Sequence, residues 1–214
     1  MTILYTLYKN TYIDLSHLDS TKGVTCYVNT TNRCPCACTF CLRQTKEMME
    51  NNSLWLKEEP SKEMIIEEFK KYDLNEFKEI VFCGFGEPME RWDDIKEVID
   101  YIRDTKKDMT IRINTNGLAN DIYGRDVTPE YKGRFDTVSI SLNAPTKEEF
   151  LELTRSKFGI SSFDDMLDFA KRCKAYVPNV VLTVVDIIGE EKIEACQKIT
   201  DEIGVTLRVR PFEE

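Results

Sequence analysis

The chain has 214 residues, of which 42% are hydrophobic, and a formal net charge of -9. This length and composition are ordinary for one globular domain with a full core, so we predict a single domain over residues 1–214. The acidic balance argues against bulk binding to nucleic acid, whose phosphates attract Lys and Arg. Basic residues do gather near the cysteine-rich segment and at the C-terminal end, which favours a positive pocket for an anionic small molecule; they are Arg33, Arg43, Lys46, Arg208 and Arg210.

The first twenty residues and the hydropathy of the chain bear on its location. No run of 18 or more apolar residues occurs, and Tyr, Asn, Asp and His interrupt the N-terminal stretch where a signal peptide needs an apolar core. We therefore expect a cytoplasmic protein that makes no membrane contact. Eight cysteines in such a chain indicate reduced thiols and a metal site.

The predicted secondary structure alternates strands with helices. Residues 1–13 are typical of a lead-in strand or hairpin arm, and residues 14–23 of a loop. Core strands are predicted at residues 24–30, 79–83, 109–114, 136–142, 180–187 and 205–210, and helices at residues 61–72, 92–104, 146–155, 162–175 and 190–203. This alternation predicts an α/β fold with a parallel sheet and right-handed crossovers. Six β/α units fit the length, whereas a closed eight-unit barrel needs about 250 residues.

Four of the eight cysteines lie within eight residues, Cys34-Pro35-Cys36-Ala37-Cys38-Thr39-Phe40-Cys41. Cysteines this close are poorly placed for native disulfides, because a bridge needs Cα separations and Cβ directions that a short loop seldom offers. Two metal sites remain open. All four thiolates would form a zinc site, although zinc sites usually add a second cysteine pair further along the chain. Cys34, Cys38 and Cys41 alone suit a cubane iron-sulfur cluster with one iron left open.

The C-x3-C-x2-C spacing, with Phe40 just before the last cysteine, resembles the loop of the radical S-adenosylmethionine (SAM) enzymes. A second motif agrees, because Ile80–Pro88 (IVFCGFGEP) has the form of the family's GGEP motif, with Phe85 where glycine is usual. The sequence around the cysteines, at residues 27–35 and 41–43, resembles more narrowly the small TatD-associated radical SAM proteins. The resemblance covers about residues 24–212 and implies an open partial (β/α)6 barrel, a TIM-like fold with parallel strands.

The resemblance also implies cofactors and a reaction. Cys34, Cys38 and Cys41 would hold a 4Fe-4S cluster, with Cys36 a bystander or a spare ligand. The reduced cluster would cleave SAM to methionine and a 5'-deoxyadenosyl radical, which abstracts hydrogen from a substrate, so the enzyme would be oxygen-sensitive. A donor such as flavodoxin or ferredoxin would supply the electron. The substrate, which is a small molecule, a peptide or an RNA, is not named by the sequence.

In a barrel of this kind the chemistry lies at the C-terminal ends of the strands. By resemblance, the segment of Gly84, Phe85, Gly86 and Glu87 would receive the methionine amino group, and Phe40 would contact adenine. Residues at the later strand ends are predicted to complete the cofactor site: Asn114, Ser141, Asn143, Arg155, Val185 and Arg210.

These later residues have ordinary structural alternatives. Asn114 and its neighbours either bind a ligand or turn the chain at Asn116-Gly117. Ser141 and Asn143 either contact the SAM ribose or carboxylate, or pack the barrel lumen. The Arg155 guanidinium either pairs with the methionine carboxylate or lies on the surface.

Three functional hypotheses follow. The first is a radical enzyme with an unidentified substrate. The second uses the same core as a glycyl-radical activase or a nucleobase-processing enzyme. The third is a non-enzymatic zinc-thiolate protein, which would be colourless. A histidine-based active site is not supported, because the single histidine, His17, lies in the N-terminal loop.

Overall fold

The computed structural model describes residues 1–9, 11–45 and 53–212. Lys46, one of the basic residues noted above, lies outside this range. The chain divides into two compact units: unit 1 comprises Met1–Arg33 and Met48–Ile113, and unit 2 comprises Cys34–Glu47 and Asn114–Glu214. The assignment of residues 1–214 to one domain stays a prediction.

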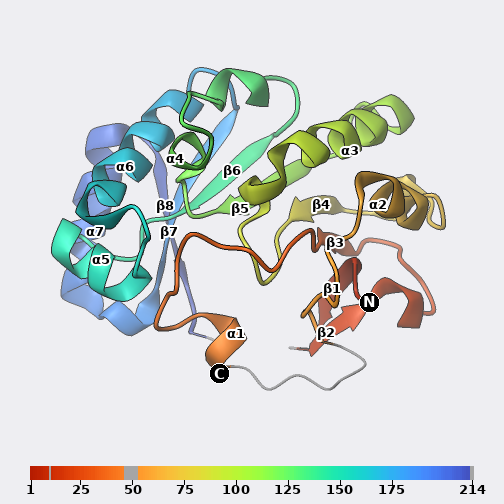
Figure 1. Ribbon diagram of the computed structural model, residues 1–214, viewed down its shortest axis with the longest axis horizontal. Coiled ribbons are helices and arrows are strands. Elements are labelled where there is room, and N and C mark those ends of the chain that lie inside the picture. Colours follow the sequence, from red (N-terminus) through yellow and green to blue (C-terminus); the bar gives the residue numbers. More distant parts are fainter. Residues whose placement is uncertain (10, 46–52, 213–214) are drawn as a thin grey trace. The chain divides into compact units, whose positions relative to one another are not determined.

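Unit 1 contains an antiparallel hairpin joined to parallel strands (Figure 1). Strand β1 (Leu4–Tyr8) pairs antiparallel with β2 (Thr11–Asp14) and with β3 (Thr25–Val28), which confirms the predicted hairpin arm. Strand β3 pairs parallel with β4 (Glu79–Phe82), which pairs parallel with β5 (Ile111–Thr115). The unit also holds the 3-10 turns η1 (Leu15–His17), η3 (Leu74–Glu76) and η4 (Pro88–Arg91).

Two amphipathic helices of unit 1 contact each other, α2 (Lys62–Phe69) and α3 (Trp92–Thr105). Helix α2 begins where the sequence predicts, because the Ser61 side chain accepts a hydrogen bond from the Met64 amide. Helix α3 presents apolar residues at helical spacing to the core, and all are fully buried: Trp92, Ile95, Val98, Ile99 and Ile102.

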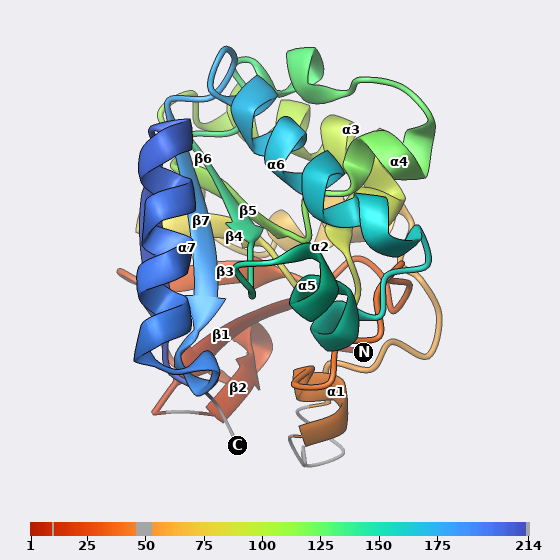
Figure 2. The ribbon, with the colours of Figure 1, turned by 90° about the vertical axis from the view of Figure 1, so that its left-hand side faces the viewer.

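Unit 2 is built on three parallel strands, β6 (Thr137–Ser141), β7 (Asn179–Val185) and β8 (Thr206–Arg210). Its longer helices are α5 (Lys147–Thr154), α6 (Ser162–Cys173) and α7 (Glu190–Ile203), and α7 runs beside β7 in Figure 2. The remaining elements are α1 (Leu42–Thr45), α4 (Ala119–Tyr123), η5 (Thr128–Tyr131), η6 (Gly159–Ser161) and η7 (Asp186–Ile188).

The predicted fold class is confirmed, since the structure is α/β with an open, mostly parallel sheet. Several predicted strand boundaries were wrong by one or two residues: the strand predicted at residues 24–30 ends at Val28, and the one predicted at residues 109–114 begins at Ile111. The apolar run predicted to continue to Ile187 leaves the sheet after Val185 and forms η7, in which the Ile187 side chain is 57% exposed. Apolar residues alone do not mark where a strand ends, because an apolar turn has the same composition. Among the described residues, no helix is long and apolar enough to cross a membrane.

Candidate functional site

The cysteine loop, Cys34–Cys41, lies along the end of α5 in unit 2. The amides of Ala37 and Thr39 donate to the carbonyl oxygens of Thr154 and Leu153, each at 2.9 Å. A third bond runs the other way, from the Lys157 amide to the Pro35 carbonyl at 2.9 Å. These bonds attach the loop to the end of α5 and fix the backbone on either side of Cys36 and Cys38.

The four thiols of this loop differ in exposure, and burial and mutual contact shift the pKa of two of them, Cys36 and Cys38. Cys36 is buried, with 5% of its surface exposed, whereas Cys34, Cys38 and Cys41 are half-buried. Hydrogen bonds to Cys34 and Cys38, together with burial, raise the pKa of the Cys36 thiol. The same contact with Cys36 lowers the pKa of Cys38. Cys36 therefore lies in contact with two of the predicted ligands as a neutral thiol, a position that sequence reasoning left undecided.

Two nitrogen donors from other residues reach the sulfur atoms. Nδ2 of Asn116 lies 4.0 Å from Cys34 Sγ and 3.8 Å from Cys36 Sγ. Nε of Arg43 lies 3.4 Å from Cys41 Sγ. No local sequence pattern marks the contact of Asn116 with Cys34, because the two residues are separated by 82 positions.

The donor set fits an iron-sulfur cluster. Soft thiolates are the ligands of such clusters, and the loop offers three at the predicted spacing, with side-chain N–H groups against the sulfurs of Cys34 and Cys41. In the described part of the chain, no three His, Cys, Asp or Glu side chains are arranged to hold a single metal ion. A cubane binds each cysteine through a different iron, so its ligands need not meet at one point.

Asn143, two residues beyond β6, has the most unusual environment of the predicted residues. Its φ is +61°, a left-handed conformation that asparagine adopts more readily than most residues other than glycine. Its side chain is buried with 4% exposed, and within the described residues its Oδ1 has no hydrogen-bond partner. A buried acceptor without a hydrogen-bond partner at a strand end suits a ligand-binding position.

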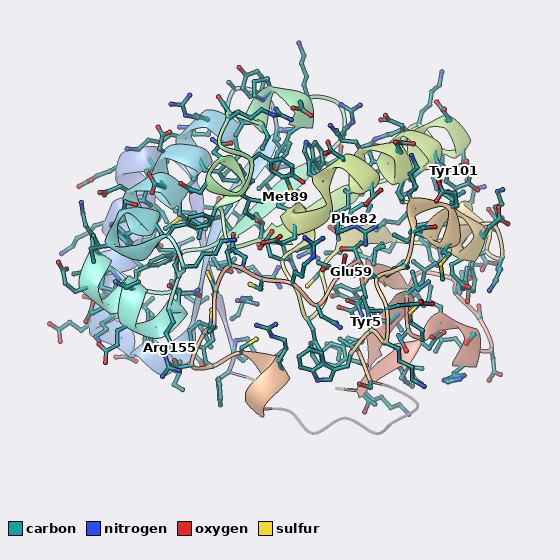
Figure 3. The ribbon with its side chains drawn as sticks, in the orientation of Figure 1. Tyr5, Glu59, Phe82, Met89, Tyr101 and Arg155 are labelled. Atoms are coloured by element: carbon teal, nitrogen blue, oxygen red, sulfur yellow. The ribbon has the colours of Figure 1, made fainter. Side chains whose placement is uncertain are left out.

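The other predicted residues of unit 2 lie at strand or helix ends. Ser141 ends β6 and is half-buried, and Asn114 is half-buried in β5. Val185 and Arg210 are register partners where β7 and β8 end. Arg155 caps α5 with φ +49° and an exposed side chain, as labelled in Figure 3.

A pocket of about 320 Å³ is lined on one side by Phe40. Its lining comes from the cysteine loop, α5, η7, α7 and the C-terminal segment: Thr39, Phe40, Glu149, Glu152, Leu153, Ile187, Ile188, Lys192 and Phe212. Lys192 and Glu149 form an ion pair at 2.7 Å on its wall. Phe40 was predicted from the sequence, whereas Glu152, Lys192 and Phe212 were not. Glu152 lies in α5, Lys192 in α7 and Phe212 after β8, and no sequence motif marks these positions. Val185 does not line this pocket.

In unit 1, the glycines of the Gly84–Pro88 segment pack against the chain itself. A Cβ on Gly84 would lie 2.2 Å from Asn29 Oδ1, and one on Gly86 would lie 2.3 Å from the Thr31 carbonyl oxygen. Both contacts are far closer than atoms allow, so glycine is required at each position for packing. The Glu87 amide donates to the Arg33 carbonyl at 2.8 Å, and the buried Glu87 carboxylate accepts from the Met89 amide at 3.1 Å.

Phe85 replaces the usual glycine without disturbing this packing. Its ring is 7% exposed and meets the ring of Trp55 edge to face, with centroids 5.3 Å apart. The Trp55 side chain, at 49% exposed, covers Phe85 on one side. The substitution therefore creates an aromatic pair beside the turn.

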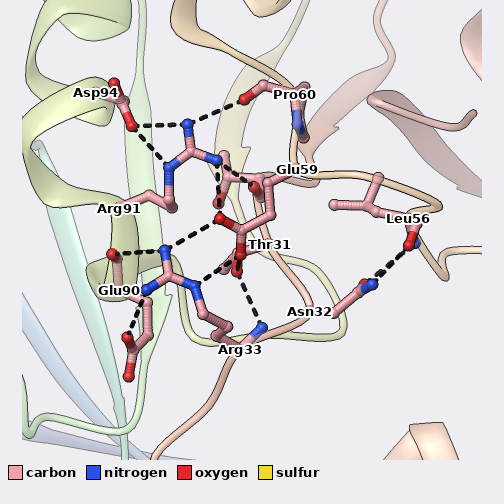
Figure 4. A network of polar contacts seen from close by, with 10 residues as sticks. Thr31, Asn32, Arg33, Leu56, Glu59, Pro60, Glu90, Arg91 and Asp94 are labelled. Atoms are coloured by element: carbon pink, nitrogen blue, oxygen red, sulfur yellow. Dashed lines mark hydrogen bonds and ion pairs between the residues drawn. The ribbon is translucent and has the colours of Figure 1, made fainter.

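The segment Asn29–Arg33, which we call the approach segment, is held by an ionic network in unit 1 (Figure 4). Arg33 donates to Glu59 through Nε at 2.8 Å and Nη2 at 3.1 Å, a bidentate pair. Thr31 Oγ1 also donates to Glu59, and Arg91 Nη1 lies 3.4 Å from its carboxylate. Although partial burial acts in the opposite direction, the hydrogen bonds from Arg33 and Thr31 lower the pKa of Glu59.

Comparison with known proteins places this arrangement in a family. The family model of the Radical SAM superfamily matches residues 28–203, which is most of the chain. The chain belongs to the radical SAM superfamily. No curated protein matches the sequence. Members of the superfamily use a 4Fe-4S cluster and SAM, which are the cofactors that the sequence predicts.

Solved structures show the same fold at low sequence identity. SuiB of Streptococcus suis, bound to the precursor peptide SuiA, is similar with a TM-score of 0.62 and 16% identity, over 88% of this chain and 39% of that chain. Methylornithine synthase (PylB) gives a TM-score of 0.61 and 15% identity, over 92% and 56%. A radical SAM methyltransferase from Sphaerobacter thermophilus gives 0.56 and 14%, over 88% and 66%. The chain thus spans well under half the length of SuiB.

Proposed function

We propose that this chain is a radical SAM enzyme whose cluster ligands are Cys34, Cys38 and Cys41. When bound, the cluster and SAM together supply reductive cleavage of the carbon-sulfur bond, giving methionine and a 5'-deoxyadenosyl radical that abstracts hydrogen from the substrate. The observation that carries the proposal is the cysteine loop, with three suitably spaced thiols, backbone bonds to α5 and N–H donors against its sulfurs. The family match agrees with it.

The pocket lined by Phe40 supports an adenine site. Its volume of about 320 Å³ falls at the lower end of the range of ligand sites. Phe40 comes from the loop that holds the cluster ligands, while Ile187 and Ile188 provide apolar contact from η7. A purine ring held here would lie against Phe40, the residue that directly precedes the proposed ligand Cys41.

Polar residues of unit 2 would orient the rest of SAM. The unpaired Oδ1 of Asn143 is suited to accept a hydrogen bond from a ribose hydroxyl, and the Ser141 hydroxyl lies on the same strand end. The exposed Arg155 guanidinium is suited to bind a carboxylate as a bidentate pair. Arg155 follows Thr154, whose carbonyl accepts a hydrogen bond from the cysteine loop, so it lies next to that loop in the chain. Asn114 and Arg210 complete this polar set at their strand ends, and Val185, the register partner of Arg210, is proposed as an apolar contact beside it.

In unit 1, the Gly84–Glu87 segment is proposed to receive the methionine amino group. The close packing of Gly84 and Gly86 on the approach segment fixes the backbone of the turn. Glu87 is buried and bonded to the Met89 amide, so its carboxylate holds the turn from within. A rigid turn presents its backbone groups to a ligand with little loss of entropy on binding.

The radical reaction needs an electron and a substrate from outside the chain. We propose a reduced flavodoxin or ferredoxin as the electron donor, and a cytoplasmic setting. The substrate is a small molecule, a peptide or an RNA; among the similar folds, SuiB was solved with a precursor peptide bound. Assignment to the TatD-associated subgroup remains part of this proposal.

The test is formation of 5'-deoxyadenosine. Protein reconstituted anaerobically with iron and sulfide, reduced with dithionite and given SAM, should release 5'-deoxyadenosine and methionine. The Cys38→Ser variant, treated in the same way, should release neither. A wild-type protein that holds a 4Fe-4S cluster and binds SAM but forms no 5'-deoxyadenosine would contradict the proposed reaction.

A further inference from the structure

The Asn116 side chain is fixed with its donor nitrogen toward the cysteine loop. Its Oδ1 accepts a hydrogen bond from the Leu118 amide at 3.0 Å, which forms a turn directly after β5. Because Oδ1 is held in this way, Nδ2 must point away from Leu118, and it lies between two thiols, 4.0 Å from Cys34 Sγ and 3.8 Å from Cys36 Sγ. The amide is thus oriented by the backbone, independently of any bound group.

The Arg43 side chain is fixed at the other end of the loop. Its Nε lies 3.4 Å from Cys41 Sγ, and its Nη2 donates to the Cys36 carbonyl oxygen at 3.5 Å. The second contact ties the guanidinium to the loop backbone, so the charge cannot easily move from the sulfur. Asn116 and Arg43 therefore contact two different proposed ligands, Cys34 and Cys41.

N–H groups against a ligand sulfur act on the reduction potential of an iron-sulfur cluster. Reduction adds an electron, and part of the added charge resides on the sulfur atoms. Donors that stabilise this charge favour the reduced state and raise the potential. A guanidinium has the larger effect, because it adds a full positive charge to the hydrogen bond.

We propose that Asn116 and Arg43 raise the reduction potential of the cluster by donating N–H···S hydrogen bonds to Cys34 and Cys41. This inference rests on the proposed function, since it requires a cluster on the cysteine loop. Both residues act through ligand sulfurs, so they are positioning residues without contact to substrate. An asparagine and an arginine from separate elements, each oriented by a backbone contact, set the electrostatic environment of the loop.

The experiment is a potentiometric titration of the reconstituted protein, followed by electron paramagnetic resonance of the reduced cluster. Asn116→Asp keeps the side-chain oxygen that accepts from Leu118 and replaces the donor by a carboxylate, so its midpoint potential should be clearly more negative than that of the wild type. Arg43→Gln should also shift the potential to more negative values, and Arg43→Lys, which keeps the charge, should shift it less.

Arg125→Gln is the matched control. It removes one cation from unit 2 at a residue paired with Glu130, and it should leave the potential unchanged. Iron and sulfide content is measured for every variant. Cluster-loaded Asn116→Asp and Arg43→Gln proteins with the wild-type potential would overturn the inference. Loss of the cluster from both variants would also overturn it, in favour of a role in assembly. A wild-type protein that takes up no cluster would instead refute the proposed function.

Discussion

The approach segment, Asn29–Arg33, and the cysteine loop, Cys34–Cys41, follow one another in sequence but are held in different ways. Side chains hold the approach segment: Asn32 exchanges hydrogen bonds with the backbone of Leu56 at 2.7 and 3.1 Å, and Arg33 binds Glu59. The cysteine loop is held mainly by backbone bonds to α5, and its thiols meet one another and the donors described above. Polar side chains thus fix the chain that leads to the loop, whereas backbone bonds fix the loop itself.

The largest effect is expected from substitutions of the proposed cluster ligands in the cysteine loop. Replacing Cys34, Cys38 or Cys41 by Ser, one at a time, should abolish the 4Fe-4S cluster, because a hydroxyl is a poor substitute for a thiolate ligand. Cys36→Ser should retain it, since Cys36 lies outside the C-x3-C-x2-C spacing and is more deeply buried than the three proposed ligands. Iron and sulfide per chain and the visible absorbance after reconstitution measure this. Equal loss of iron from Cys36→Ser would show that the ligand set is wrong.

The next effect breaks the turn packed on the approach segment. Gly86→Ala places a Cβ 2.3 Å from the Thr31 carbonyl and 2.6 Å from the Arg33 carbonyl, so the backbone must move. We expect the free energy of unfolding to fall by about 1–3 kcal/mol, the usual cost of overpacking. Urea unfolding measures it, with the exposed Lys57→Ala as a control that should change little. A Gly86→Ala protein as stable as that control would refute the packing argument.

A smaller effect, on the affinity for SAM, is expected from a substitution at Phe40, where the loop lines the pocket. Phe40→Ala removes an aromatic wall of the pocket, and the dissociation constant for SAM should rise about tenfold, since an aromatic contact contributes on the order of 1 kcal/mol. Equilibrium binding to reconstituted protein tests this. Ile160→Ala, at a side chain that is 47% exposed and not part of the pocket lining, should bind SAM as the wild type does. Unchanged affinity in Phe40→Ala would remove adenine from this pocket.

The smallest effect concerns the ionic network of the approach segment. Glu59→Gln should lower the free energy of unfolding at pH 7 by about 1 kcal/mol, because one carboxylate serves Arg33, Arg91 and Thr31 at a partly exposed site. The folded-state pKa of Glu59 lies below its ordinary value of 4.5. Its contribution is therefore present above pH 4.5 and is lost as the pH falls through the folded-state pKa.

Urea unfolding of Glu59→Gln and wild type across this pH range measures the difference. The matched control is Glu67→Gln, whose partner Lys70 is exposed and which should change stability little at any pH. A Glu59→Gln difference that persists undiminished well below the folded-state pKa would contradict the electrostatic origin.

Much of the fold follows from local sequence signals. Helix α7 occupies residues 190–203 as predicted, and α2 begins after Ser61, because periodicity and capping are properties of neighbouring residues. The five-residue helix α4 was missed, since so short a segment carries little periodicity. The end of β7 was misplaced because Ile187 and Ile188 continue an apolar run after the backbone has turned.

The candidate site divides in the same way. The cysteines and the Gly86-Glu87-Pro88 turn are visible as spacing in the sequence, so they were predicted. The contact of Asn116 with Cys34 and the role of Glu59 depend on residues brought together from distant positions, and no local pattern marks them. Asn143 was predicted as a ligand contact, but its left-handed backbone and its unpaired oxygen are properties of the folded chain alone.

The central claim is that the cysteine loop holds a cluster with an iron open to SAM. The most direct measurement is electron paramagnetic resonance of the anaerobically reconstituted, reduced protein before and after SAM is added. The account predicts a 4Fe-4S signal that changes when SAM binds. Bound zinc with no 4Fe-4S signal would contradict it and would leave a zinc-thiolate protein on this fold.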